Sequence, residues 1–462
     1  MARQSTAWAP GRLAQARPAY LALADAIAAD LARGRLRPGD RMPTHRALAP
    51  ALGVTVGTVA RGYAEAERRG LLSGEVGRGT FVRAGFAAAP ATDGVADLAS
   101  LHPPAADADA PAALLGETLA GLAADPLALR AVAETDHSAD SASHREAAAA
   151  WVAHGAFAPD ADQILLTSGA QHALTVALMA LVPAGSAVAT TTLTNPGLVA
   201  AARQLGVPLV AVAGDETGMV PEALERACAE RPVAAAYLQP TLHNPLAVTM
   251  PARRREQLAA VCARADVWVL EDDPLGPLAP ERPDPVAAVL PERTCYLASA
   301  AKVLALGLRV GVLAGPESAL PRLTAALRAS TWLAAPILGE ILARWVRHGI
   351  AQHVVEGRIA TTRARRAVAR EVLGADLAPA DPGSPHVWLP LPEPWSTGGF
   401  VNAARDAGVL VSPGDDYVAD RRLPALGVRL GLNAELDDEA LRSALLTVRE
   451  VLRAGPSPAP LG

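Results

Sequence analysis

The chain has 462 residues, with 42 Lys and Arg against 47 Asp and Glu, and therefore a formal net charge of −5. This length exceeds one ordinary core, so two or three domains are expected. No run of about twenty apolar residues occurs and the sequence begins without the apolar stretch of a signal peptide, so we expect a cytoplasmic protein that spans no membrane. The cysteines show no C-x-x-C spacing and indicate neither disulfides nor a metal site: Cys228, Cys262 and Cys295.

Charge is distributed unevenly along the chain. Residues 1–85 contain 13 Arg against 6 Asp and Glu, a net charge of +7, which leaves −12 for the remaining residues. A basic head on an acidic body favours a head that binds nucleic acid and a body with a different task.

The basic head has the pattern of a winged helix-turn-helix. Apolar residues at helical spacing predict a helix from Tyr20 to about Leu36, and two further helices are predicted over 44–52 and 55–69, separated by a break at Gly53. Residues 70–82 then read as a two-stranded hairpin. The second helix of such a pair can enter the major groove of DNA.

The stretches "GRLRPGDRMPTHRALAPALGV" and "GRGTFV" resemble the GntR family of winged-helix regulators over about residues 17–83. Thr55 has a structural alternative, as the cap of the recognition helix. Val56 and Gly57 stand where the family usually has polar or basic residues, so weaker DNA binding or base discrimination is expected. The resemblance implies contacts with double-stranded DNA through Arg46, Thr55, Thr58, Arg61 and Arg78.

Beyond the head, we expect three parts: a winged helix-turn-helix domain at 1–84, a connector rich in Ala, Pro and Gly at 85–97, and a large domain at 98–462. In the large domain, apolar runs alternate with helical patterns, which predicts an α/β fold with a mostly parallel sheet and ligands at the carboxyl ends of its strands. The predicted strands are 163–167, 186–191, 208–213, 234–240, 267–272, 294–299 and 311–315.

The large domain also contains the only lysine of the chain, Lys302 in "SAAKVLALGLRVG", beside 41 arginines. Arginine replaces lysine in most surface roles, but its guanidinium cannot become a neutral amine nucleophile. A retained lysine is therefore typical of Schiff-base chemistry, with an accidental surface residue as the alternative. Polar residues follow other predicted strands in "TSGAQHAL" (167–174), at Asn244 and at Asp272. The alternative for each of these residues is that it only stabilises a turn, as Ser, Asn and Asp commonly do.

In this order the motifs resemble the fold-type I aminotransferases and, with the head, the MocR subgroup of GntR regulators, over nearly the whole chain. The resemblance implies pyridoxal 5′-phosphate as cofactor, with Lys302 as its Schiff-base lysine and Arg429 as the residue for an effector carboxylate. Asn244 is implied to donate to the cofactor's phenolic oxygen, and Asp272 to pair with its pyridine nitrogen. The residues implied to hold the phosphate are Ser168, Gly169, Ala170, Gln171, Ser299 and Arg309.

Several positions depart from that family. Asn195 replaces a ring-stacking tyrosine, Pro274 or Leu275 replaces a tyrosine that contacts the phenolic oxygen, and Ala301 replaces a serine before the lysine. Each loss removes stacking or a hydrogen bond worth roughly 0.5 to 1.5 kcal/mol. We therefore expect a site that binds the cofactor but turns over slowly, with at most a residual aminotransferase-type half-reaction.

Three functions remain open at this point. The first is a homodimeric transcriptional regulator whose aminotransferase-like domain senses a vitamin B6 vitamer, an amine or an amino acid. The second is an active aminotransferase with an appended DNA-binding head. The third is a regulator whose large domain is only a dimerisation scaffold. The basic head favours the first and third, and the retained lysine, aspartate, asparagine and arginines favour the first.

Overall fold

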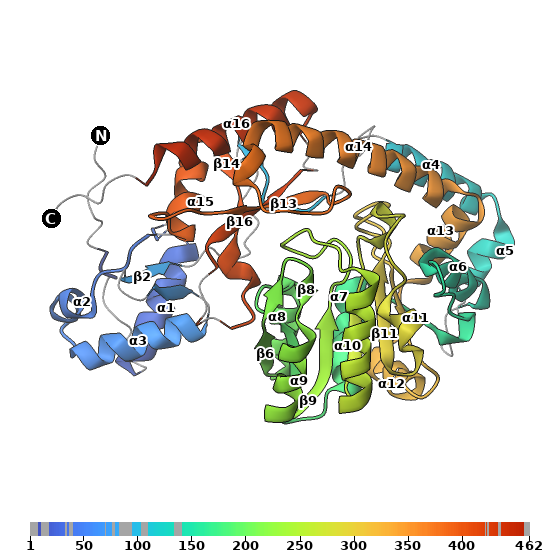
Figure 1. Cartoon of the computed structure of the whole chain (residues 1–462), viewed down its shortest axis with the longest axis horizontal. Helices are drawn as coiled ribbons and strands as arrows, with labels where there is room; N and C mark the ends of the chain where they lie inside the picture. Colours follow the sequence, from blue (N-terminus) through green and yellow to red (C-terminus); the bar gives the residue numbers. More distant parts are fainter. Residues whose placement is uncertain are drawn as a thin grey trace.

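The computed structural model has a small helical head, a large sheet covered by helices, and a smaller domain formed near the C-terminus (Figure 1). The structure describes residues 8–10, 18–32, 35–36, 40–69, 71–75, 79–82, 95–102, 110–133, 141–420, 422, 425–432 and 436–456.

The head is built as its sequence pattern predicts, with three helices followed by a hairpin. The Thr44 hydroxyl caps the second helix by accepting the Ala47 amide at 3.2 Å, and Gly53 ends that helix in the left-handed conformation that glycine adopts most readily (φ 64°). The first and third helices pack closely, because a Cβ added at Gly62 would lie 2.7 Å from Leu23 Cδ2. The elements are α1 (Ala19–Ala32), α2 (His45–Leu52), α3 (Val56–Arg68), β1 (Leu72–Glu75) and β2 (Gly79–Val82).

The large domain contains a seven-stranded sheet of order β4-β12-β11-β10-β9-β5-β6. All its pairings are parallel except the two made by β12, so the prediction of a mostly parallel sheet is confirmed. The strands are β4 (Ile164–Thr167), β5 (Ala187–Thr191), β6 (Leu209–Val212), β9 (Val233–Leu238), β10 (Trp268–Asp272), β11 (Thr294–Ser299) and β12 (Gly311–Ala314).

Successive side chains along these strands point to opposite faces of the sheet, and both faces are buried. Tyr237, Leu270 and Leu297 pack with α7 and α12 in one core cluster, whereas Val269 and Tyr296 point to the opposite face. The covering helices and small strands are α4 (Ala110–Ala123), α5 (Pro126–Ala133), α6 (Ala142–Val152), α7 (Ala170–Leu181), α8 (Pro196–Leu205), α9 (Pro221–Glu230), α10 (Ala252–Ala265), α11 (Val286–Val289), α12 (Leu320–Ser330), α13 (Pro336–Arg347), β7 (Gly214–Asp215) and β8 (Gly218–Met219).

The smaller domain packs a three-stranded sheet, of order β13-β16-β15, against helices that include a long one, α14. Its second, short sheet pairs β3 with β14 in parallel, so residues 96–97, at the end of the expected connector, pair with the C-terminal part of the chain. The elements are β3 (Ala96–Asp97), α14 (Ile350–Leu373), β13 (His386–Pro390), α15 (Thr397–Asp406), β14 (Val409–Leu410), β15 (Ser412–Pro413), β16 (Gly427–Gly431) and α16 (Asp438–Ala454).

Among the described residues, no single helix is long and apolar enough to cross a membrane. One strongly bent pair, Pro111–Ala123 with Pro126–Ala133, meets the criteria of length and composition only.

Candidate functional sites

Four of the predicted DNA-contacting residues lie on α2 and in the first half of α3, counting its N-cap Thr55. Arg46 is exposed on α2, and Arg61 is exposed on α3 with its guanidinium carbon 5.4 Å from the centre of the Tyr20 ring. Thr55 accepts the Thr58 amide at 3.1 Å, and the two threonine hydroxyls lie 2.9 Å apart. Thr55 therefore has the capping role that the sequence left open, and its DNA contact stays a prediction. The predicted contact Arg78 lies outside the described residues.

The candidate cofactor site lies at one edge of the large sheet. The carboxyl ends of the parallel strands β4, β9, β10 and β11 meet at this edge, and each is followed by a polar segment. Because β12 is antiparallel, its first residues reach the same edge, which brings Arg309 next to the turn after β4. The fold thus gathers residues separated by more than a hundred positions.

The turn between β4 and α7 has the features of an anion-binding site. Gly169 adopts φ +92°, and a Cβ added there would lie 2.9 Å from Arg309 Nη2, so the guanidinium lies directly over this turn. No side chain caps α7, and among the described residues no acceptor is bonded to the amides of Gly169, Ala170 or Gln171. Arg309 has no carboxylate partner in the described part of the chain. A helix start with open amides beside an unpaired cation suits a phosphate.

Three of the predicted phosphate ligands have other partners. The Ser168 amide donates to His172 Nδ1 at 3.1 Å, and the Gln171 side-chain amide donates to the Gly197 carbonyl at 2.9 Å. Ser299 is buried, and its hydroxyl accepts the Ala301 amide at 3.2 Å. The open amides of this turn and Arg309 have no such partners among the described residues, while both serine hydroxyls can still donate, so the phosphate roles of Ser168, Gln171 and Ser299 stay predictions.

Lys302 lies in the turn after β11, half-buried, with Nζ 3.1 Å from the Leu101 carbonyl oxygen that accepts its hydrogen bond. Burial lowers the pKa of Lys302 to about 8, and the positive charges of Arg429 and Arg309 act in the same direction. A lysine with this pKa has a substantial neutral fraction near physiological pH, as an amine nucleophile requires.

Arg429 comes from β16 in the smaller domain and reaches the same site. Its Nη1 donates to Asn244 Oδ1 at 3.0 Å and its Nη2 donates to the Ala99 carbonyl, while its buried Nε has no hydrogen-bond partner. The guanidinium carbon lies 5.5 Å from the centre of the Tyr417 ring. Arg429 is buried without a carboxylate partner among the described residues, which suits the carboxylate of a ligand.

Asp272, at the end of β10, is almost fully buried and carries a network that the sequence analysis missed. Its Oδ2 accepts hydrogen bonds from the Tyr237 hydroxyl, from Gln239 Nε2 at 3.1 Å and from Asn195 Nδ2 at 3.2 Å. Burial raises the pKa of Asp272 to about 6, although these three hydrogen bonds lower it. The sequence carried no signal for this network, since it depends on the parallel register that sets Tyr237 beside Leu270 and so brings Gln239 level with Asp272.

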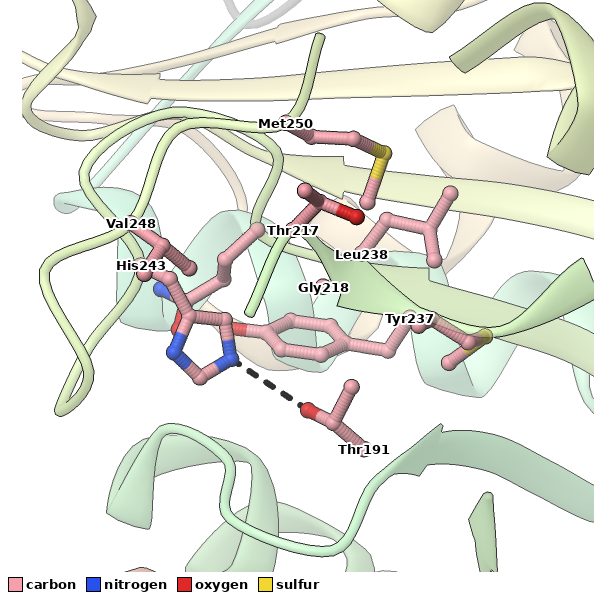
Figure 2. A pocket seen from close by; sticks show the side chains of 10 residues that line it. Thr191, Thr217, Gly218, Tyr237, Leu238, His243, Val248 and Met250 are labelled. Atoms are coloured by element: carbon pink, nitrogen blue, oxygen red, sulfur yellow. Dashed lines mark hydrogen bonds between the residues drawn. The ribbon is translucent and has the colours of Figure 1, made fainter. Parts of the chain in front are cut away.

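Tyr237 and Gln239 also line a small cavity. Figure 2 shows the Tyr237 side chain in this cavity, near His243. His243 Nε2 lies 3.2 Å from the Thr191 hydroxyl in this cavity, and burial lowers the pKa of His243 to about 4, so the ring is neutral. The buried Gln239 Oε1 has no partner in the described chain.

The residues at the positions that depart from the aminotransferase family are buried or half-buried, and one of them caps a helix. Leu275 is buried in a core cluster, and Pro274 is half-buried. Asn195, expected only as a lost stacking residue, caps α8 by accepting the Gly197 amide at 3.1 Å and donates to Asp272. Ala301 is buried.

Comparison with known proteins agrees with this two-part architecture. Residues 123–447 match the family model "Aminotransferase class I and II", and residues 19–82 match "Bacterial regulatory proteins, gntR family". The HTH-type transcriptional regulator YdeF of Bacillus subtilis is 29% identical over 458 residues, covering 96% of this chain and 96% of that protein.

A second relative matches nearly the whole chain, and a solved structure matches most of it. The vitamin B6 salvage pathway transcriptional repressor PtsJ of Salmonella typhimurium is 27% identical over 441 residues, 93% of this chain and 97% of that protein. The crystal structure of an archaeal alanine:glyoxylate aminotransferase superposes with a TM-score of 0.72 at 21% identity, covering 78% of this chain and 91% of that one, which shows the fold.

Proposed function

Because the chain belongs to the aminotransferase class I and II family and carries a GntR-type head, the arrangement of MocR regulators, we propose that it is a transcriptional regulator in which the aminotransferase-like domain senses a small ligand. In this proposal the head binds double-stranded DNA, and the large domain uses bound pyridoxal 5′-phosphate to detect a vitamin B6 vitamer, an amine or an amino acid. The protein acts in the cytoplasm as a homodimer. The name of PtsJ, a repressor of vitamin B6 salvage, supports a B6-related ligand.

The aminotransferase fold implies pyridoxal 5′-phosphate, and the residues present fit it. The open amides at the start of α7 and Arg309 match the phosphate, and Asp272 matches the pyridine nitrogen. Asn244 uses Oδ1 to accept from Arg429, which leaves its Nδ2 to donate to the phenolic oxygen. When bound, the cofactor supplies an aldehyde for an amine and a ring that withdraws electrons.

The observation that carries the proposal is the set of three cations in one site, Lys302, Arg309 and Arg429, none with a carboxylate partner among the described residues. Buried or clustered cations are costly unless a ligand or partner compensates them. A large domain used only as a scaffold for dimerisation has no need for this arrangement. The set therefore supports ligand sensing over the scaffold alternative.

The test combines DNA binding with ligand addition. Binding of the full chain to fragments of its own upstream region is measured by fluorescence anisotropy, with and without pyridoxal 5′-phosphate and pyridoxal. We expect Arg46→Ala and Arg61→Ala to weaken binding strongly, affinity to fall steeply with salt, and the ligand to change affinity in wild type but not in Lys302→Ala. Equal DNA binding by wild type and both arginine variants at moderate salt contradicts the proposal that the head binds DNA through Arg46 and Arg61.

An aminotransferase is the second candidate, favoured by Arg429, which is buried without a carboxylate partner among the described residues and suits a substrate carboxylate. We expect it to be slow, because Asn195 cannot stack on the cofactor ring and a small misplacement of reacting groups costs about a hundredfold in rate. A turnover number of the order of 1 per second or more with common amino donors and 2-oxo acids, the range of ordinary enzymes, overturns this expectation.

A further inference from the structure

We propose that Tyr237 and Asn195 are positioning residues that keep Asp272 ionised and present its Oδ1 to the pyridine nitrogen of the cofactor. This inference rests on the proposed function, because it concerns the same cofactor. It assigns a role to two residues that do not themselves take part in the chemistry.

Strand register explains how the network forms. Tyr237 and Leu270 are directly paired in the parallel β9 and β10 ladder, and Tyr237 shares its face of the sheet with Leu270 and hence with Asp272, two residues further on. Glu271 and Asp273 point to the opposite face. The Tyr237 hydroxyl therefore approaches Asp272 from within the sheet, below the open edge where the ligand binds.

All three donors of the network converge on one carboxylate oxygen. Tyr237, Gln239 and Asn195 each donate to Oδ2, and none donates to Oδ1. An ionised carboxylate with one oxygen fully engaged is fixed in rotation and offers its second oxygen in one direction. This arrangement matches a single N–H donor such as a protonated ring nitrogen.

The protonation states agree with this role. Burial opposes the charge on Asp272, and burial together with the Asp272 carboxylate raises the pKa of Tyr237 well above its ordinary value, so the phenol remains a donor. Loss of one hydrogen bond to the carboxylate favours its neutral form. The proton shared by ring nitrogen and carboxylate then moves toward Asp272.

Asn195 is the second positioning residue, and its Nδ2 also lies 3.3 Å from the Tyr237 hydroxyl. It stands where a stacking aromatic was expected, yet its amide is bonded at both ends, to the Gly197 amide and to Asp272. The substitution therefore exchanges ring stacking for an additional donor to the carboxylate.

The experiment reads the position of the proton directly. Full-length protein is loaded with pyridoxal 5′-phosphate labelled with ¹⁵N in the ring, and the nitrogen chemical shift is recorded by NMR at neutral pH. We expect a protonated nitrogen in wild type, and in Tyr237→Phe a shift toward the unprotonated value that corresponds to an about 10- to 100-fold change in the protonation ratio. Tyr296→Phe is the matched control, because Tyr296 is an equally buried phenol that donates to the neighbouring Asp273 at 2.7 Å on the opposite face, and we expect no change.

If Tyr237→Phe does not fold, Asn195→Asp tests the other positioning residue with the same measurement. It keeps an acceptor for the Gly197 amide, removes the donor and adds a like charge beside Asp272, so the shift should move in the same direction. An unchanged ¹⁵N shift in a folded, loaded Tyr237→Phe or Asn195→Asp protein refutes the role of that residue. Failure of wild type to bind the labelled cofactor instead refutes the proposed function, so the two outcomes are distinct.

Discussion

At the phosphate end of the candidate site, Arg309 and the start of α7 offer a charge and amides that no described residue satisfies, whereas at the ring end the Asp272 oxygen Oδ2 already has three donors. The phosphate end has hydrogen-bond donors and a positive charge that a ligand would satisfy, whereas the hydrogen bonds to Asp272 Oδ2 at the ring end are all made by the protein. This difference teaches that affinity for the cofactor should come mainly from the phosphate end, and control of its electronic state from the ring end.

The largest effect is expected for Lys302→Ala, which removes the only lysine of the chain. The variant should lose all covalent attachment of the cofactor and its visible absorption band, since no other side-chain amine is present to replace it. Borohydride reduction followed by peptide mass spectrometry measures this. Label at another residue, or an unchanged band in the variant, contradicts the assignment.

Arg309→Leu should weaken binding of pyridoxal 5′-phosphate by about 10- to 100-fold, because a charge-assisted contact to phosphate is lost. Isothermal titration measures the dissociation constant. Pyridoxal, which lacks the phosphate, serves as the matched ligand and should bind both proteins alike. An equal loss for the two ligands would place Arg309 in a general structural role instead.

The rate of covalent cofactor capture should depend on pH through Lys302, whose pKa of about 8 is lowered from its usual value. Only the neutral amine reacts, so the rate should rise about tenfold per unit below pH 8 and level off above it. Stopped-flow absorbance gives this profile. Continued increase up to about pH 10 would show that the site does not lower the pKa.

The smallest effect on cofactor affinity is expected for Ser299→Ala. The Ser299 hydroxyl accepts the Ala301 amide inside the protein, so the substitution should lower the free energy of unfolding by about 1 to 3 kcal/mol while cofactor affinity changes only slightly. Urea unfolding and the titration described above separate the two effects. A tenfold loss of affinity without loss of stability would instead support the predicted role of Ser299 as a phosphate ligand.

Sequence patterns predicted the elements of the head and the seven strands of the large sheet, because helical and strand periodicity report local burial. The pairing of β3 with β14 could not be predicted, since two residues carry no periodicity. Within the site, Lys302 and Asp272 were identifiable from residue type and position after a strand. The role of Asn195 was not, because a donor to Asp272 is defined by a contact across 77 positions rather than by a motif.

Residues 95–102 connect the ligand site with the chain that leads to the DNA-binding head. This short segment is held by the Gly431 amide on the Leu98 carbonyl, by Arg429 on Ala99 and by Lys302 on Leu101. A carboxylate that binds Arg429, or a cofactor that engages Lys302, competes with those carbonyls for their donors. Ligand binding is therefore expected to release the Ala99 and Leu101 carbonyls from these donors, in a segment whose preceding residues stay paired with β14.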